Sequence, residues 1–571
     1  MSLSPSRREF LRILGAGAAY AGSGLAQTSA AAFRTPFVKD LRRNRATIGW
    51  LASSPGEGTV EFWGDSRAIR KVAATMRQVG TRYRFSAELD GLAPASSYGY
   101  RASMDGERIG LARFQTPGST SFEFLAFGDS GTGSAIQRRL AQRMLQHADA
   151  GFVVHTGDLV YPAGTYERYE SLYFGYYEAL MRNAPFFPCP GNHDYYEENS
   201  IPYRALHSVP DQTVQSQDQG RYYSFDWGNA HFVSLDTNES LFRAVAGSGD
   251  MLRWLDADLA ASHKFWRIVV LHHSPYAEGV HSGEIEGKMI REHVSPILQR
   301  HAVTLVLNGH EHSYQRSIPI GGTTYITTGG GGAPLHAVTP SPLVEKAVAE
   351  HHYVSVTVTD GKLKLRALRA DGSELDSWDL APQPRLVSVV NAASFGEELA
   401  AGGLASIFGH HLALDRATVT WNGQPLAVLM AAPTQINVQL PHATGEGTLK
   451  VQAPNGTASR KVSIAAIAPA LFEDALLRAD GTAVTKDAPA KPGETLSVYA
   501  TGLGKGTPVG VEWNGEEVTA QTTAVVELQG VYMVTFEAPM AEFSEAQLHV
   551  VAGGKRSNPV RVPGATAAAN N

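Results

Sequence analysis

The pattern of hydrophobic and polar positions changes near residue 121. Residues 35–117 contain short segments rich in aromatic and β-branched residues, such as RATIGWLAS and SSYGYRASM, with turn clusters such as SSPGEG between them. Further on, compact apolar runs such as SFEFLAF and GFVVHT alternate with longer stretches such as SAIQRRLAQRMLQHA. Short strands between turns are typical of a β-sandwich, whereas strands that alternate with helices predict an α/β layered domain. The chain is therefore expected to have an all-β unit over 35–117 and an α/β layered core over 120–381.

A third region of short strands and Gly/Pro turns follows the segment APQPRL, which is typical of a linker. Two of its segments echo each other, GGLASIFGHHLA (402–413) and GETLSVYATGLG (493–504). Each is a Gly-led strand that ends in a Gly turn. This repeat predicts two tandem immunoglobulin-like sandwiches over 385–565. The tail, 566–571, is expected to be disordered.

Both all-β regions resemble known modules. LDGLAPASSYGYRA followed by FQTP resembles the closing strands of a fibronectin type III sandwich, so residues 35–117 are expected to have a structural or lid role. NAASF, PTQINVQLP and SVYATGLG resemble a C-terminal β-module found on many secreted bacterial proteins. That module is a candidate for binding an unknown surface or partner.

The N-terminus joins a twin arginine to a mild apolar run, in SRREFLRILGAGAAYAGSGLA (6–26). This resembles a twin-arginine export signal over 1–30, and the alternative is an amphipathic N-terminal helix. No other stretch reaches 18 apolar residues without charges, so no transmembrane span is expected in the mature protein. The resemblance implies a protein exported by the twin-arginine route, periplasmic or secreted.

Charge and cysteine usage exclude several classes of function. The 571 residues carry a formal net charge of -6, so no basic surface for nucleic acid is expected. Cys189 is the only cysteine, which excludes an intrachain disulfide. We expect Cys189 to be a buried apolar side chain.

Five short polar strings each follow an apolar strand of the α/β region. They are GDSG (128–131), GDLVY (157–161), GNHD (191–194), VLHH (270–273) and GHEH (309–312). Each string alone is weak evidence, since GD after a strand is also typical of an Asx turn. Active-site residues of layered α/β folds gather at the carboxyl ends of strands. The five loops are therefore expected to converge on one edge.

That edge would carry oxygen and imidazole donors, from Asp129, Asp158, Tyr161, Asn192, His273, His310 and His312. Carboxylate, amide and imidazole donors without a thiolate suit iron, zinc or manganese. Seven donors are too many for one tetrahedral ion, and they suit two ions that share a bridging carboxylate. Two ions about 3.5–4 Å apart can clamp a phosphoryl group and activate a water molecule.

The five strings, in this order, resemble the signature blocks of the calcineurin-like metallophosphoesterases. With Tyr161 included, they resemble the purple acid phosphatase pattern within that family. The resemblance is strong over about 120–335 and implies an αββα sandwich, and residues 35–117 resemble the N-terminal β-domain of the larger members. It implies a binuclear metal centre of Fe(III) and a divalent iron, zinc or manganese ion.

The resemblance also implies a role for each matching position. The ferric ligands would be Asp129, Tyr161 and His312, the divalent ligands Asn192, His273 and His310, and the bridge Asp158. His193 matches a histidine that contacts substrate and protonates the leaving group, and His281 lies about where the family has another substrate-side histidine. His272 is an alternative to His273 as a ligand. We prefer His273 because the family's ligand directly precedes the "SP" step.

The implied activity is hydrolysis of a phosphate ester by attack of a metal-bound hydroxide. The leading hypothesis is an exported acid phosphatase that cleaves phosphomonoesters. A phosphodiesterase or nucleotidase would use the same centre, because selectivity depends on the walls of the pocket. The third hypothesis is a non-catalytic surface-binding protein with β-modules.

Overall fold

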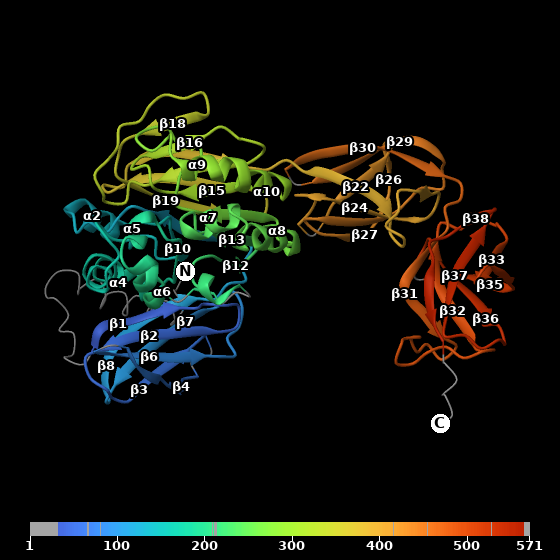
Figure 1. Ribbon diagram of the computed structural model, residues 1–571, viewed down its shortest axis with the longest axis horizontal. Coiled ribbons are helices and arrows are strands. Elements are labelled where there is room, and N and C mark those ends of the chain that lie inside the picture. The colour runs from blue at the N-terminus through green and yellow to red at the C-terminus, as the bar shows by residue number, and fades with distance from the viewer. Residues whose placement is uncertain are drawn as a thin grey trace, which may run out of the picture.

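The computed structural model describes residues 32–564, apart from 66–67, 80, 208, 211–213, 415, 454 and 527. The predicted export signal (1–30) and the predicted disordered tail (566–571) lie outside the described residues. Figure 1 shows a layered core with one β-sandwich below it and two further sandwiches that follow each other toward the C-terminus. Within the described part of the chain, no helix has the length and apolar character needed to cross a membrane.

The N-terminal unit is a sandwich of two antiparallel sheets. Alternate residues of β3 (Gly58–Trp63) are buried, as expected when one face of a strand meets the core and the other meets water. The rings of Trp50 and Phe85 stack inside the sandwich with centroids 5.1 Å apart. The strands, in their order within the two sheets, are β1 (Ala32–Lys39), β2 (Ala46–Ala52), β6 (Arg82–Leu89) and β5 (Thr75–Val79), then β4 (Arg70–Ala73), β3, β7 (Ser97–Met104) and β8 (Glu107–Gln115).

Two larger sheets form the layered core. The first has six strands, in the order β11 (Phe186–Pro188), β10 (Ala150–His155), β9 (Phe122–Phe127), β19 (His352–Val358), β20 (Leu363–Arg369) and β21 (Glu374–Leu380). The second has seven, in the order β12 (Tyr223–Trp227), β13 (Ala230–Ser234), β14 (Trp266–Val270), β15 (Leu305–Asn308), β17 (Thr324–Thr328), β16 (Tyr314–Ser317) and β18 (Val344–Val348).

Alternation along the strands separates the core into layers. Phe124 points between the two sheets and meets the ring of Phe232 edge-on, with centroids 5.2 Å apart. Its neighbour Leu125 points the other way and packs in the cluster that contains Met144 of the outer helices. The second sheet alternates in the same way, since Val233 packs in the cluster that contains residues of the helices on the outer face of that sheet. The result is the predicted αββα arrangement flanked by all-β regions, so the predicted fold class is confirmed.

Helices cover the outer face of each sheet. Ser134 caps the first described helix by accepting a hydrogen bond from the Gln137 N–H. The helical segments between β9 and β12, which include those that cover the first sheet, are α2 (Ala135–Met144), α3 (Tyr166–Arg168), η2 (Tyr169–Phe174), α4 (Gly175–Met181), α5 (Asn192–Tyr195), η3 (Glu198–Ser200), α6 (Ile201–Leu206) and η4 (Ser216–Asp218). Those that cover the second sheet are α7 (Glu239–Val245), α8 (Met251–Ala261), α9 (Ile285–Met289), η5 (Ile290–Val294) and α10 (Ser295–Arg300).

Two further sandwiches follow the core, each with its own hydrophobic cluster. The first contains β22 (Arg385–Asn391), β24 (Leu404–His410), β28 (Gln435–Gln439) and β27 (Ala427–Ala431), facing β23 (Leu399–Ala400), β30 (Gly456–Ala465), β29 (Gly445–Ala453), β25 (Thr418–Trp421) and β26 (Gln424–Pro425). The second contains β31 (Ala470–Arg478), β32 (Thr495–Thr501), β36 (Val531–Glu537) and β35 (Ala520–Ala524), facing β34 (Glu516–Val518), β33 (Val509–Trp513), β37 (Glu545–Ala552), β38 (Lys555–Arg556) and β39 (Val560–Pro563).

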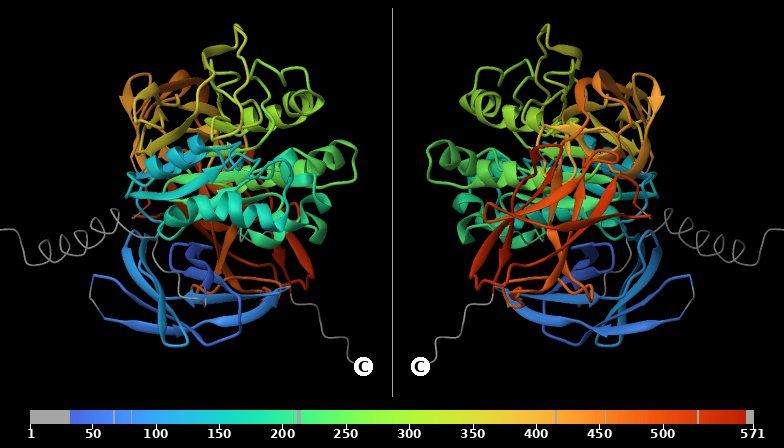
Figure 2. Two further views of the ribbon diagram at one scale, coloured as in Figure 1. Left: turned by 90° about the vertical axis from the view of Figure 1, so that its left-hand side faces the viewer. Right: turned by 90° about the vertical axis from the view of Figure 1, so that its right-hand side faces the viewer.

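The N-terminal sandwich is fused to the core more closely than the later sandwiches. Its buried residues and those between the two core sheets belong to one continuous hydrophobic cluster. Tyr100 is fully buried, and its hydroxyl donates to the carbonyl oxygen of Arg182 at 2.8 Å. Arg34 pairs with Glu170 across the same boundary. Figure 2 shows the N-terminal sandwich directly below the core in both side views.

Candidate metal centre

Two sets of parallel strands, one in each core sheet, end at the metal-centre edge of the core. β9, β10 and β11 run parallel in the first sheet, and β14 and β15 run parallel in the second. The polar strings of the sequence follow directly after these strands. They bring together the side chains of Asp129, Asp158, Tyr161, Asn192, His272, His273, His310 and His312.

The backbone at the strand ends is unusually tight. A Cβ atom on Gly191 would lie 2.1 Å from Asp158 Oδ1, and one on Gly309 would lie 2.4 Å from Asp129 Oδ2. These glycines therefore let the carboxylates approach the neighbouring loops. Asp129, Asp158 and His310 have φ angles of 56°, 51° and 68°, in the left-handed region. Such angles cost free energy in residues with a side chain and concentrate at functional sites.

Tyr161 lies at the centre of one half of the cluster. Its hydroxyl oxygen is 3.0 Å from Asp158 Oδ2, 3.2 Å from Asp129 Oδ1 and 3.1 Å from His312 Nε2. Burial and the charges of Asp158 and Asp129 raise the pKa of Tyr161 well above its ordinary value. Burial disfavours a charge on His312, but the Asp129 carboxylate outweighs burial and raises the pKa of His312 to about 9.

His272 lies at the centre of the other half. Its Nε2 atom is 3.0 Å from Asn192 Oδ1, 3.1 Å from His310 Nδ1 and 3.5 Å from Asp158 Oδ1. Asp158 thus borders both halves, because its other oxygen faces Tyr161. This is the geometry expected of a carboxylate that bridges two ions.

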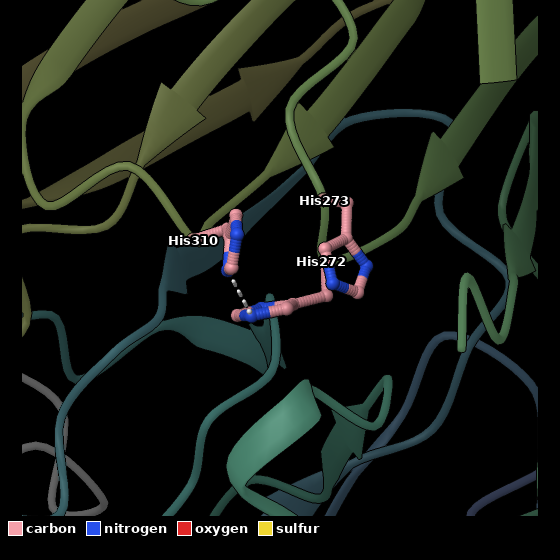
Figure 3. A group of neighbouring side chains, drawn as sticks. All are labelled: His272, His273 and His310. Carbon is pink, nitrogen blue, oxygen red and sulfur yellow. Dashed lines mark hydrogen bonds between the residues drawn. The ribbon is translucent and has the colours of Figure 1, made fainter. Parts of the chain in front are cut away.

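The neighbouring histidine, His273, has different contacts. Its Nδ1 atom lies 2.8 Å from Thr237 Oγ1, and its pKa is lowered well below the ordinary value by burial and by His310 and His272. One ring nitrogen of His273 still lies within 4.8 Å of a nitrogen of His272 and of His310. Figure 3 shows these three histidines, with a dashed line that joins His310 to His272. Of the two histidines, His272 is the one that lies beside Asn192 and Asp158.

The hydrogen-bond partners of the histidines indicate which ring nitrogens face the cluster. A carbonyl oxygen only accepts hydrogen bonds, so His272 Nδ1, 2.8 Å from the Thr156 oxygen, must carry a proton, as must His312 Nδ1, 2.7 Å from the Pro334 oxygen. His310 is held in the same way at Nε2, which lies 2.6 Å from Glu284 Oε2. A metal ligand has to be a neutral imidazole, and in that form the other nitrogen of each ring presents a lone pair to the carboxylate and amide oxygens. Acceptors that converge on acceptors fit cations, so these residues fit a metal centre.

Comparison with known families supports this interpretation. A family model for calcineurin-like phosphoesterases matches residues 122–314, the range from β9 to β16 that includes all five strings. The chain contains a calcineurin-like phosphoesterase domain.

Known relatives of the phosphoesterase domain include purple acid phosphatases. An uncharacterized protein of Mycobacterium tuberculosis is 29% identical over 304 residues, which are 47% of this chain and 56% of the relative. Purple acid phosphatase 21 of Arabidopsis thaliana is 30% identical over 262 residues, 42% of this chain and 56% of the relative. The chain thus spans little more than half the length of these two relatives. Among solved structures, the purple acid phosphatase PPD1 of yellow lupin seeds shares the fold, with a TM-score of 0.53, 20% identity and coverage of 61% of this chain and 74% of that one.

The two remaining predicted site residues border the cluster in the phosphoesterase domain. His193 Nδ1 lies 2.7 Å from the Pro162 carbonyl oxygen, and His193 Nε2 lies 3.9 Å from Asp158 Oδ2. The ring of His281 lies 4.1 Å from that of His310, between centroids. Both histidines are partly exposed, with 26% and 24% of the side chain accessible, so both can meet a substrate.

Glu284 is a site residue that the sequence did not reveal. Its two carboxylate oxygens lie 2.7 Å from His281 Nδ1 and 2.6 Å from His310 Nε2. These two hydrogen bonds lower the pKa of Glu284 to about 2, with His310 the larger cause. The charged carboxylate orients both rings, as acceptors behind metal-binding histidines do. The only sequence feature that could have suggested it is its position three residues after His281.

Asp194 supports the loops from beneath. It accepts hydrogen bonds from the backbone N–H of Gly191 at 2.8 Å and from the Tyr169 hydroxyl at 2.7 Å. Burial and then the charge of Asp158 raise the pKa of Asp194 to about 7. The last residue of the GNHD string thus holds the loop that presents Asn192.

Proposed function

We propose that this protein is a metal-dependent phosphoester hydrolase, an acid phosphatase that cleaves phosphomonoesters. One observation carries the proposal: donors from five strand ends converge, and the histidines among them are tied from behind so that their free nitrogens face inward. A phosphoesterase domain with purple acid phosphatases among its relatives is the expected setting for such a site.

The proposed centre holds two ions. We assign Asp129, Tyr161 and His312 to a ferric ion, Asn192, His272 and His310 to a divalent iron, zinc or manganese ion, and Asp158 to both. His272 replaces His273 in this assignment because its Nε2 is the nitrogen beside Asn192 and Asp158. Two such ions supply Lewis-acid chemistry, which polarises the phosphoryl group and lowers the pKa of water. A phenolate is a hard donor, which is the reason for assigning Fe(III) to the side of Tyr161.

The protein's own groups manage the protons. The Pro162 carbonyl keeps a proton on His193 Nδ1, so when the ring is protonated a second proton resides at Nε2, near Asp158. That proton is positioned for transfer to the oxygen of the leaving alcohol. General acids of this kind contribute about 10²–10⁴-fold to the rate. His281, fixed by Glu284 through Nδ1, is a second group on the substrate side.

The sequence adds two proposals about the whole protein. The twin-arginine resemblance at 6–26 supports export of a folded, metal-loaded enzyme to the periplasm or the medium. The C-terminal sandwiches are candidates for attachment to a surface outside the cytoplasm. Loss of surface retention on deletion of 385–571 would support attachment, and unchanged retention would contradict it.

The test of the catalytic proposal compares a phosphomonoester with a bis-ester. Wild-type protein is expected to hydrolyse the monoester faster, and Asp158→Ala is expected to lower both activities by about 100-fold or more, because both ions lose a ligand. Turnover by Asp158→Ala equal to that of wild type would contradict a binuclear hydrolase. Faster turnover of the bis-ester would replace the phosphatase by a phosphodiesterase.

A further inference from the structure

Tyr196, the residue that ends the single turn α5, lies beside two residues of the proposed centre. Asn192 and Tyr196 are four residues apart and His193 and Tyr196 are three apart, so all three side chains share one side of the turn. The Asn192 amide NH₂ group donates to the Tyr196 hydroxyl oxygen at 3.0 Å. The rings of Tyr196 and His193 meet nearly edge-on, with centroids 4.8 Å apart.

The hydroxyl of Tyr196 holds the NH₂ end of the Asn192 amide on the outer side of the site. An amide has an oxygen that accepts and a nitrogen that donates. With its NH₂ group bound to Tyr196, Asn192 turns its oxygen to His272 Nε2, at 3.0 Å. An amide oxygen can bind a cation, whereas an NH₂ group cannot, so this orientation is the one that a divalent site requires.

The ring of Tyr196 is exposed although the residue is large and apolar, with 63% of its surface accessible. The residue before it behaves differently, since the Tyr195 hydroxyl donates to Asp236 Oδ2 at 2.5 Å. Tyr195 therefore anchors the turn, and Tyr196 is held outward beside His193. His193 is in turn 4.3 Å from the ring of Tyr161, between centroids. The exposed ring of Tyr196 thus lies against His193, the proposed proton donor to the leaving alcohol.

We infer that Tyr196 sets the substrate class of this site: it holds the Asn192 amide through its hydroxyl and contacts an aromatic leaving group through its ring, so the protein prefers phosphate esters of aromatic alcohols. The inference rests on the proposed phosphatase function and adds the identity of the alcohol. Stacked or edge-on aromatic pairs are favourable beyond the area they bury, and the effect corresponds to about three- to tenfold in affinity.

Two variants separate the roles of ring and hydroxyl. Phenyl phosphate and glycerol 2-phosphate are the probes, and kcat and KM are measured for each with metal-loaded full-length protein. Tyr196→Leu is expected to lower kcat/KM for phenyl phosphate about three- to tenfold more than for glycerol 2-phosphate, mainly through KM. Tyr196→Phe keeps the ring, so it is expected to retain the aromatic preference. Without the hydroxyl, it is also expected to release divalent metal to a chelator faster than wild type.

Phe395→Leu is the matched control, because Phe395 is also 63% exposed but lies on the first C-terminal sandwich. It is expected to leave kcat/KM for both substrates unchanged. Inhibition of wild type gives a measurement that needs no variant: phenylphosphonate is expected to bind about three- to tenfold more tightly than methylphosphonate. Equal binding of the two phosphonates, or an equal loss on both esters in Tyr196→Leu, would overturn the inference and leave the phosphatase proposal standing. A wild type that hydrolyses neither ester overturns both.

Discussion

At the scale of single residues, the two adjacent histidines after β14 are distinguished by their partners. His272 shares its proton at Nδ1 with a backbone carbonyl and turns Nε2 to Asp158, whereas His273 faces the Thr237 hydroxyl. His272→Ala is therefore expected to lower activity by about 100-fold or more and to reduce the bound divalent metal. His273→Ala is expected to cost less than about tenfold and to keep both ions.

Metal analysis together with turnover checks this prediction. Both variants remove a buried imidazole of the same size from adjacent positions, so each is a control for the other's effect on packing. Full metal content in His272→Ala, with metal lost only in His273→Ala, would return the ligand role to the residue that the sequence favoured.

Tyr161 gives the centre a visible signature at the same scale. Burial and two carboxylates raise its pKa, so its phenolate forms only when a strong cation lies against the oxygen. If that cation is Fe(III), the protein is expected to be purple to pink, and Tyr161→Phe is expected to bleach or shift the band. A visible absorption spectrum together with iron analysis tests the ferric assignment. A colourless wild type that holds only zinc or manganese would contradict the ferric assignment and leave the hydrolase proposal intact.

At the scale of elements, β13 takes part in a network of charged side chains that is separate from the metal centre. His231 on β13 lies 2.8 Å from Asp226 on β12 and 2.8 Å from Asp258 on α8. Burial opposes a charge on His231, but the two carboxylates outweigh it and raise its pKa. A raised folded-state pKa stabilises the protein at pH values below about 6.5, the pKa of unfolded histidine, and the gain is lost as pH rises through the folded-state pKa.

His231→Gln is therefore expected to destabilise the protein more at low pH than at high pH. The expected loss in free energy of unfolding is about 1–2 kcal/mol near pH 5.5 and smaller near pH 8.5. This range allows for solvent screening of the His231–Asp226 pair, because Asp226 is half exposed. Denaturant titrations at the two pH values measure it. Ser224→Ala, which removes only the hydroxyl beside Asp258, is a control with little pH dependence. An equal loss at both pH values would contradict the assignment of a charged His231.

Elements were more predictable from the sequence than side-chain orientation. Strand and helix periodicity predicted the layers, and the polar strings identified which strand ends converge, because parallel strands end at a common edge. The choice between His272 and His273 was beyond the sequence, because β14 ends at Val270 and the loop after it has no regular alternation. Glu284 and Tyr196 were missed for a similar reason. Their roles depend on a loop and a single helical turn that bring them against His310 and Asn192.

At the scale of the whole molecule, the three sandwiches differ in their relation to the core. The N-terminal sandwich shares a hydrophobic cluster with the space between the core sheets, and Tyr100 bonds to the end of α4 through the Arg182 carbonyl. The two C-terminal sandwiches have clusters of their own. The first of them meets the core where the ring of His411 lies 5.1 Å from that of Phe265, between centroids. The pattern of strands and turns predicted three β-sandwiches but could not show that one of them completes the core.

Two deletions test this difference. Removal of 385–571 is expected to leave a folded enzyme with kcat within about twofold of the full chain, because no described residue of the metal centre lies beyond 314. The melting temperature is expected to fall by a few degrees as Phe265 becomes exposed. Removal of 32–117 is expected to give insoluble or unfolded protein, because the apolar surface that it uncovers belongs to the core cluster. Circular dichroism, thermal melts and phosphomonoester turnover measure both outcomes. A soluble, active protein without 32–117 would show that the shared cluster is dispensable, and an inactive one without 385–571 would show that the C-terminal sandwiches act on the site.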